Sequence, residues 1–240
     1  MGLFGNKYKK TASKGVCAVI LAAGSGTRMG CTDTSKTMLE LLGKPVISYT
    51  LRAYEAAESV DSIVVVARSE DMLLITDIAR EFNISKLKSV VVGGASRSES
   101  VEKGLAALPQ TTGYVAIADG ARPLITPNII NNTVQQALET GGAAAAIPIR
   151  DTLKRVADGK IVQTIDRTAM YAVQTPQVFD IIKYRAARAI ASAEEYTDDT
   201  KYFEDAGFSV ALTEGSVSNI KITYREDVVL AESILEKRGF

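Results

Sequence analysis

The alternation of short apolar runs with helix-period segments is the feature that most restricts how this chain can fold. From residue 16 onward, runs of strand length recur, separated by segments with the spacing of amphipathic helices. Such alternation is typical of βαβ units, which build a parallel sheet with helices on its faces. We therefore predict an α/β fold with a Rossmann-like, mostly parallel sheet flanked by helices. The runs predicted as strands are 16–23, 62–67, 89–93, 114–119 and 143–149.

Residues at the ends of the helical segments support this prediction. Segment 45–58 opens with Pro45, and segment 126–142 has Thr126 in the N-cap position and ends at paired glycines. Proline in the first turn, threonine at the N-cap and glycine after the last turn are all favoured at helix ends. Beyond them we expect a helix near 178–192, strands at 208–214 and 219–223, and a closing helix at 227–238.

The alternation is interrupted at residues 149–179, which read as two extended polar segments around a turn at Asp158-Gly159. This pattern predicts an extended β-arm, at about 149–175, that leaves the main sheet. A two-stranded hairpin is marginally stable alone in water, so we expect a second copy of the chain to pack against it. The arm thus predicts a homodimer.

Composition narrows the partners and the chemistry. The chain has 28 basic and 28 acidic side chains among 240 residues, so nucleic acid and membranes are not expected partners and any phosphate site must be local. It contains no histidine, which excludes histidine triads, histidine metal ligands and histidine bases. Two cysteines and no long apolar stretch favour a cytoplasmic location. Residues 1–14 are predicted to be a flexible basic tail and residues 15–240 a single domain.

The first predicted strand runs into a glycine-rich loop, AAGSGTRMG, at residues 22–30. Small residues let backbone N–H groups approach phosphate oxygens, and Arg28 adds a planar cation. A dinucleotide fingerprint would need glycine or alanine at Met29, and a P-loop would need Gly-Lys-Ser/Thr after its spacer. Neither is present. An ordinary turn could look similar, but Lys36 adds a second cation past the strand's carboxyl end, where open α/β sheets bind ligands.

Further motifs follow along almost the whole chain, from about residue 16 to residue 235. They are GKPVISYTL (43–51), GGASRSESV (93–101), DGARP (119–123), RDTLKR (150–155), DR (166–167), QTPQVF (174–179) and EGSVSNIKIT (214–223). In this order they resemble the 2-C-methyl-D-erythritol 4-phosphate cytidylyltransferases of the non-mevalonate isoprenoid pathway. The resemblance implies an enzyme that joins CMP from CTP to methylerythritol phosphate with release of pyrophosphate. It also implies Mg²⁺ held mainly by the CTP phosphates, with no metal ligand assigned to the protein.

The resemblance also implies roles for individual residues. Arg28, Lys36 and Lys221 match the family's cations on the triphosphate and are the expected catalytic residues. Arg122, Thr152 and Arg167 match residues that hold the sugar phosphate, the last two reaching from the arm into a second subunit. The residues expected to bind CTP are Ala22, Ala23, Gly24, Gly26, Gly94, Ser100 and Asp119.

Three departures from the family pattern bear on affinity more than on the reaction. Lys36 lies eight rather than seven residues after Arg28, Ala95 replaces a common acidic residue, and Ala118 replaces a common histidine. Two alternatives remain open: a ribitol 5-phosphate cytidylyltransferase, which shares the fold and nucleotide chemistry, and a non-catalytic nucleotide-binding homologue. The arm sequence favours the methylerythritol enzymes, and the retained cations argue against a non-catalytic protein.

Overall fold

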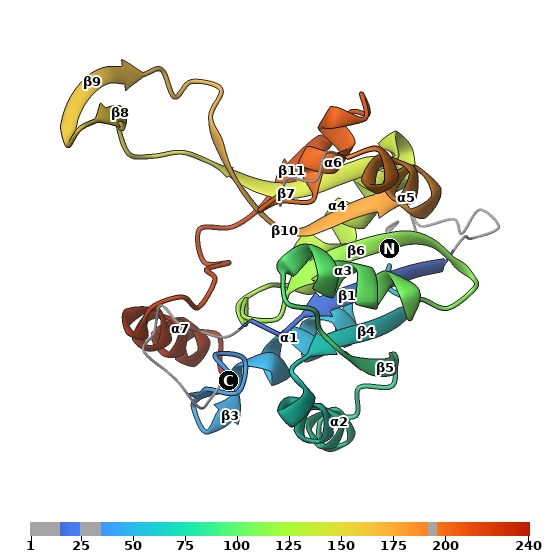
Figure 1. The fold of residues 1–240 in the computed structure, drawn as a ribbon. Coiled ribbons are helices and arrows are strands. Elements are labelled where there is room, and N and C mark those ends of the chain that lie inside the picture. Colours follow the sequence, from blue (N-terminus) through green and yellow to red (C-terminus); the bar gives the residue numbers. More distant parts are fainter. Residues whose placement is uncertain (1–14, 25–34, 192–195) are drawn as a thin grey trace, which may run out of the picture.

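A computed structural model describes residues 15–24, 35–191 and 196–240, and its centre is a seven-stranded sheet (Figure 1). The order across the sheet is β11-β7-β10-β6-β1-β4-β5. The predicted tail at 1–14 and most of the glycine-rich loop lie outside the described residues. The strands of this sheet are β1 (Gly15–Leu21), β4 (Ser62–Ala67), β5 (Leu87–Val92), β6 (Thr112–Asp119), β7 (Gly142–Pro148), β10 (Tyr171–Asp180) and β11 (Ala211–Glu214).

Most neighbouring strands are parallel, which confirms the predicted fold class. β1 pairs in parallel with both β4 and β6, and β4 pairs with β5 and β7 with β11 in the same sense. β10 is antiparallel to both of its neighbours, β6 and β7. The chain re-enters the sheet at β10 directly from the arm, without the crossover helix that a parallel return requires. β10 is therefore the strand at which the parallel arrangement of the sheet is broken.

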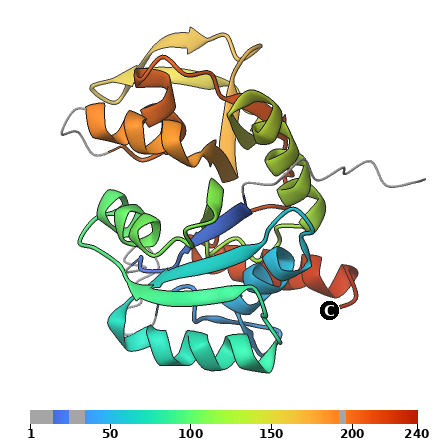
Figure 2. The same ribbon diagram turned by 90° about the vertical axis from the view of Figure 1, so that its right-hand side faces the viewer.

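Helices cover both faces of the sheet (Figure 2). On one face, α1, α2 and α4 share a hydrophobic cluster with alternate residues of β1, including Ala18 and Ile20. On the other face, α3, α5 and α6 share a second cluster with Cys17 and Val19. The alternation of side chains along a strand divides them between the two layers. The helices are α1 (Val46–Ala56), α2 (Met72–Glu81), α3 (Arg97–Ala106), α4 (Pro127–Thr140), α5 (Ile181–Ile190), α6 (Thr200–Asp205) and α7 (Arg225–Lys237).

The predicted ends of α4 are confirmed. The Thr126 side chain accepts a hydrogen bond from the amide of Ile129, and the helix ends at Gly141 with φ of 90°. A left-handed residue at this position closes the last turn, and glycine adopts it without steric cost. In the described part of the chain, no helix is both long and apolar enough to cross a membrane.

The predicted arm is present as a hairpin of β8 (Leu153–Ala157) and β9 (Lys160–Ile165) that projects from the body (Figure 1). Its turn lies at the expected Asp158-Gly159, where φ is 48° and 72°. Two successive residues with positive φ give a tight turn that matches the twist of a hairpin. β10 begins at Tyr171, so the last residues of the predicted excursion already belong to the central sheet.

Two of the predicted elements are wrong in type or extent. Residues 219–223 are not a strand but an irregular segment before α7, in which Ile222 donates to Ala121 O at 2.8 Å and is fully buried. The apolar side chains of this segment, Ile220 and Ile222, pack in a cluster with α7 and with the short hairpin of β2 (Glu40–Leu41) and β3 (Lys44–Pro45). The helix predicted at 178–192 begins only at Ile181, because Val178 and Phe179 complete β10 in the core.

Candidate active site

The sheet order reverses between β1 and β6, which are neighbours in the middle of the sheet. Leu21 at the end of β1 pairs with Asp119 at the end of β6, so both loops that follow leave the sheet at one point. Such a switch point is where open α/β sheets bind ligands. Ala22 and Gly24 lie in the first of these loops, and Ala22 donates its amide to Val66 O at 2.7 Å. The structure thus places this end of the glycine-rich loop where the sequence predicted a nucleotide.

The loop after β5 lies against the loop after β1. A Cβ atom on Gly93 would come within 2.5 Å of the Ala23 Cβ, so only glycine allows this approach. The amide of Gly94 donates to Ser100 Oγ at 3.1 Å, and Ser96 caps α3 by accepting from the amide of Glu99 at 3.1 Å. The structure therefore brings Ala23, Gly94 and Ser100 close together. They lie beside the start of α3, where exposed amides and the helix dipole favour negative charge.

Asp119 is the centre of a charged cluster at the switch point. Its Oδ1 accepts from Lys221 Nζ at 2.8 Å and its Oδ2 from Arg122 Nε at 3.0 Å. Burial raises the pKa of this carboxyl, but Lys221 and Arg122 outweigh that effect and hold the pKa at about 2. Asp119 is consequently an anion at neutral pH, and it holds two of the predicted cations side by side.

Lys36 is held by the segment around it. The Ser35 and Thr37 hydroxyls lie 2.7 Å apart, both residues are buried, and Thr37 O accepts from the amide of Ile47 in the first turn of α1. These contacts fix the backbone on both sides of Lys36, whose side chain is half-buried. Arg28 and Gly26, the other predicted residues of this loop, lie outside the described residues.

The arm residues are placed differently. Thr152 immediately precedes β8 and Arg167 follows β9, so both lie at the end of the hairpin opposite its turn. Both residues are exposed. Arg167 O accepts from the amide of Met170 at 2.9 Å, which turns the chain towards β10. Among the described residues of this chain, neither bonds to the Asp119 cluster.

Two residues at the site were not singled out from the sequence. Thr175 Oγ1 accepts from the amide of Asp119 at 3.1 Å, and Asn219 O accepts from Arg122 Nη1 at 2.6 Å. Both residues stand in motifs that carry the family resemblance, QTPQVF and EGSVSNIKIT. Their positions in those motifs were the signal that could have found them.

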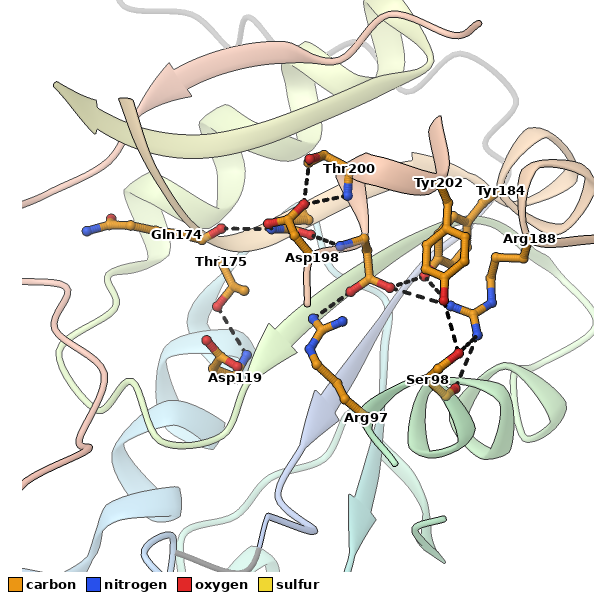
Figure 3. Close-up of polar contacts among 12 residues, drawn as sticks. Arg97, Ser98, Asp119, Gln174, Thr175, Tyr184, Arg188, Asp198, Thr200 and Tyr202 are labelled. Atoms are coloured by element: carbon orange, nitrogen blue, oxygen red, sulfur yellow. Dashed lines mark hydrogen bonds and ion pairs between the residues drawn. The ribbon is translucent and has the colours of Figure 1, made fainter. Parts of the chain in front are cut away.

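A polar network ties the start of α3 to α5 and α6, the neighbouring helices on the same face of the sheet (Figure 3). Arg97 Nη2 lies 2.5 Å from Asp199 Oδ2, and Asp199 is fully buried. Burial lowers the pKa of Arg97, but pairing with Asp199 outweighs that effect and the net pKa is raised. Arg188 donates to Ser98 Oγ at 2.9 Å and its guanidinium lies 4.4 Å from the Tyr202 ring centre. The first turn of α3, close to Gly94, is therefore held both by Asp199 and by Arg188 of α5.

The fold and this site together define an α/β nucleotide-binding protein of the nucleotidyltransferase type, with cations gathered at the switch point. A model of the 2-C-methyl-D-erythritol 4-phosphate cytidylyltransferase family (IspD) matches residues 16–237. The chain belongs to this family.

Individual relatives agree with that assignment. A protein of Pelotomaculum thermopropionicum named 2-C-methyl-D-erythritol 4-phosphate cytidylyltransferase is 42% identical over 227 residues, covering 93% of this chain and 95% of that protein. One of the same name from Halalkalibacterium halodurans is 40% identical over 222 residues, covering 92% and 96%. The crystal structure of 4-diphosphocytidyl-2C-methyl-D-erythritol synthase from Anaerococcus prevotii has a TM-score of 0.81 at 30% identity, covering 92% and 98%.

Proposed function

We propose that this chain transfers CMP from CTP to 2-C-methyl-D-erythritol 4-phosphate and releases pyrophosphate. The observation that carries the proposal is the pairing of Asp119 with Lys221 and Arg122 at the switch point. Family membership supplies the identity of the nucleotide and of the acceptor. For this reason we prefer this reaction to that of a ribitol 5-phosphate cytidylyltransferase and to a non-catalytic nucleotide-binding homologue.

The chemistry suits a site without histidine. A phosphate monoester is largely ionised near neutral pH, so its oxygen can attack the α-phosphorus of CTP without a protein base. The bond from the α-phosphorus to the bridging oxygen breaks, and that oxygen leaves with pyrophosphate. Negative charge grows on the phosphates during this step, so fixed cations lower the barrier. We assign this role to Lys221 and Lys36, with Arg28 as the third cation.

The same proposal assigns the remaining contacts. Main-chain groups of Ala22, Ala23 and Gly24, with Gly26 further along the loop, hold the nucleotide. Gly94 and Ser100 contact CTP from the second loop, and Asp119 lies near its ribose. Arg122 holds the acceptor phosphate together with Thr152 and Arg167.

We propose Mg²⁺ as the cofactor, held mainly by the CTP phosphates. In the described residues, no group of three acidic, cysteine or histidine side chains could hold a metal ion. Asp119 does offer a carboxylate at the site, and Mg²⁺ commonly binds one or two carboxylates together with substrate phosphates. The ion would supply further positive charge on the phosphates of bound CTP.

We also propose that the chain works as a homodimer in which each arm completes the partner's site. Val156, Ile161 and Val162 on the hairpin are 56%, 66% and 57% exposed, which is costly for apolar groups in water and favours burial by a second subunit. In this scheme residues 15–240 act as one nucleotidyltransferase domain and residues 1–14 as a basic tail. We place the enzyme in the cytoplasm, where a free buried thiol such as Cys17 stays reduced.

The direct test measures pyrophosphate release from CTP with purified protein and Mg²⁺. Release should depend on methylerythritol phosphate. Release with ribitol 5-phosphate alone would favour the alternative enzyme. Absence of release with either acceptor, despite CTP binding, would favour the non-catalytic homologue.

A further inference from the structure

The pairing of β10 is interrupted at residues 174–176, next to the Asp119 cluster. The register of β10 against β7 shifts between Val173 and Gln177. In such a bulge the main chain loses ladder partners and its polar groups need others. The side chain of Gln174 reaches the segment before α7: its Nε2 donates to Ser216 O at 2.8 Å and its Oε1 accepts from the amide of Ser216 at 3.3 Å.

Asn219 closes this connection from the other side. Its Nδ2 donates to Gln174 Oε1 and to Thr175 O, both at 3.1 Å. Its own carbonyl accepts from Arg122 Nη1 at 2.6 Å. The residue is fully buried. One asparagine therefore joins the bulge of β10, the segment before α7 and the loop after β6.

These three segments are the ones that carry the charged cluster. Thr175 contacts the amide of Asp119, Arg122 pairs with the Asp119 carboxylate, and Lys221 lies two residues after Asn219. Displacing Asn219 would leave the Arg122 guanidinium held by Asp119 alone and would loosen the backbone that presents Lys221. A substitution of Asn219 alone could therefore displace the charges of Arg122 and Lys221, although neither of those residues is itself changed.

We propose that Asn219 is a positioning residue for cytidylyl transfer, which sets Arg122 and Lys221 around Asp119 by clamping the segment before α7 to the bulge of β10. This inference rests on the proposed function, since it concerns the same reaction.

The side chain of Asn219 fits this role better than a purely structural one. Its Oδ1 is buried and has no hydrogen-bond partner among the described residues. An unsatisfied buried acceptor destabilises a folded protein, so an amide at this place is not explained by stability alone. The amide group does provide two N–H donors on Nδ2, which bond to Gln174 Oε1 and to Thr175 O. Aspartate has no such donors, and leucine has no polar atoms.

The test compares Asn219→Ala with the matched control Asn131→Ala. Asn131 also makes two hydrogen bonds, accepting from the amide and hydroxyl of Ser59 at 3.1 and 2.7 Å, but it lies on α4 away from the cluster. Both variants should melt at lower temperature. Only Asn219→Ala should lose kcat/KM for the acceptor, by about 100-fold, because small displacements of charged groups are costly in the transition state. Equal kinetics in the two variants would overturn the inference.

A double-mutant cycle asks whether Asn219 acts through Arg122. Arg122→Lys keeps the positive charge but removes the Nη1 contact to Asn219 O. If both changes damage the same arrangement, their combined loss in kcat/KM should be smaller than the product of the single losses. Multiplicative losses would overturn the proposed route. If Asn219→Ala does not fold, Asn219→Ser, which keeps one donor, carries the same measurements with a smaller expected loss.

Wild-type enzyme is assayed beside every variant, so that the two proposals can fail separately. Wild-type protein without cytidylyl transfer would overturn the proposed function and this inference together. Active wild type with an equally active Asn219→Ala variant would overturn the inference alone.

Discussion

Lys221 Nζ lies 2.8 Å from Asp119 Oδ1, although the two residues are 102 positions apart. The pair holds a flexible lysine at the switch point before any substrate binds. Together with Arg122 it keeps the Asp119 carboxyl ionised, with its pKa at about 2. The site is thus an ordered arrangement of charge around one buried anion.

Titration of Asp119 should therefore affect stability only at low pH. Its pKa is lowered from 3.8 to about 2 in the folded protein, so its contribution is fully present above the unfolded value and is lost as pH falls towards 2. The shift corresponds to about 2 kcal/mol. Urea unfolding of wild type and Asp119→Asn between pH 7 and pH 2 measures it. The stability difference should be constant above about pH 5 and shrink below about pH 4; a constant difference down to pH 2 would contradict the assignment.

Lys36→Ala should lower turnover by roughly 100-fold or more, because it removes positive charge that stabilises the transition state. Steady-state rates of pyrophosphate release measure the effect. Lys88→Ala is the control, since Lys88 is an exposed lysine on β5, and it should retain wild-type turnover. Unchanged turnover in Lys36→Ala would remove this lysine from the mechanism.

Lys221→Met should reduce kcat while leaving the fold intact. The methionine keeps the length of the side chain but not its charge, and Asp119 retains its bond to Arg122. A circular dichroism melt separates misfolding from a catalytic defect. A kcat equal to that of wild type would show that Lys221 only neutralises Asp119.

Gly93→Ala should lower the affinity for CTP, whereas its effect on the stability of the fold should be small. The added Cβ would lie 2.5 Å from the Ala23 Cβ and 3.0 Å from Ser100 Oγ, so it would push the two nucleotide loops apart. Gly104→Ala is the matched comparison, because its Cβ would meet Val19 Cγ1 at 2.4 Å in the core and should cost about 1–3 kcal/mol of stability. Calorimetric CTP titration and thermal melting of both variants would test this. The prediction fails if both variants bind CTP equally well.

Two inactive variants should restore activity when their subunits are mixed. In a heterodimer of Lys36→Ala and Arg167→Ala chains, one site contains both defects and the other contains neither. Random reassembly should give about a quarter of the wild-type activity, since half of the dimers are mixed and each has one intact site. The mixture is refolded together and assayed beside each variant alone. No recovery, or a monomer by light scattering, would contradict the shared site.

The fold class and much of the local structure can be predicted from the sequence. Apolar runs with a strand period or a helix period decide which face is buried, and this preference is local. Thr126 and Gly141 at the ends of α4, and the Asp158-Gly159 turn of the arm, are where the sequence places them because capping and positive φ depend on the residue itself.

Which side chains meet depends instead on how distant segments pack. The direction of β10, the irregular course of residues 219–223 and the contact of Asn219 with Arg122 depend on sheet order and register between distant segments. The hydrophobic periodicity of a short stretch of sequence does not show which distant segments pair with it. Asp119 could be read from the sequence as a residue at the end of a strand. That it binds Lys221 and Arg122 at once follows from the packing of β6, β10 and the segment before α7 around it.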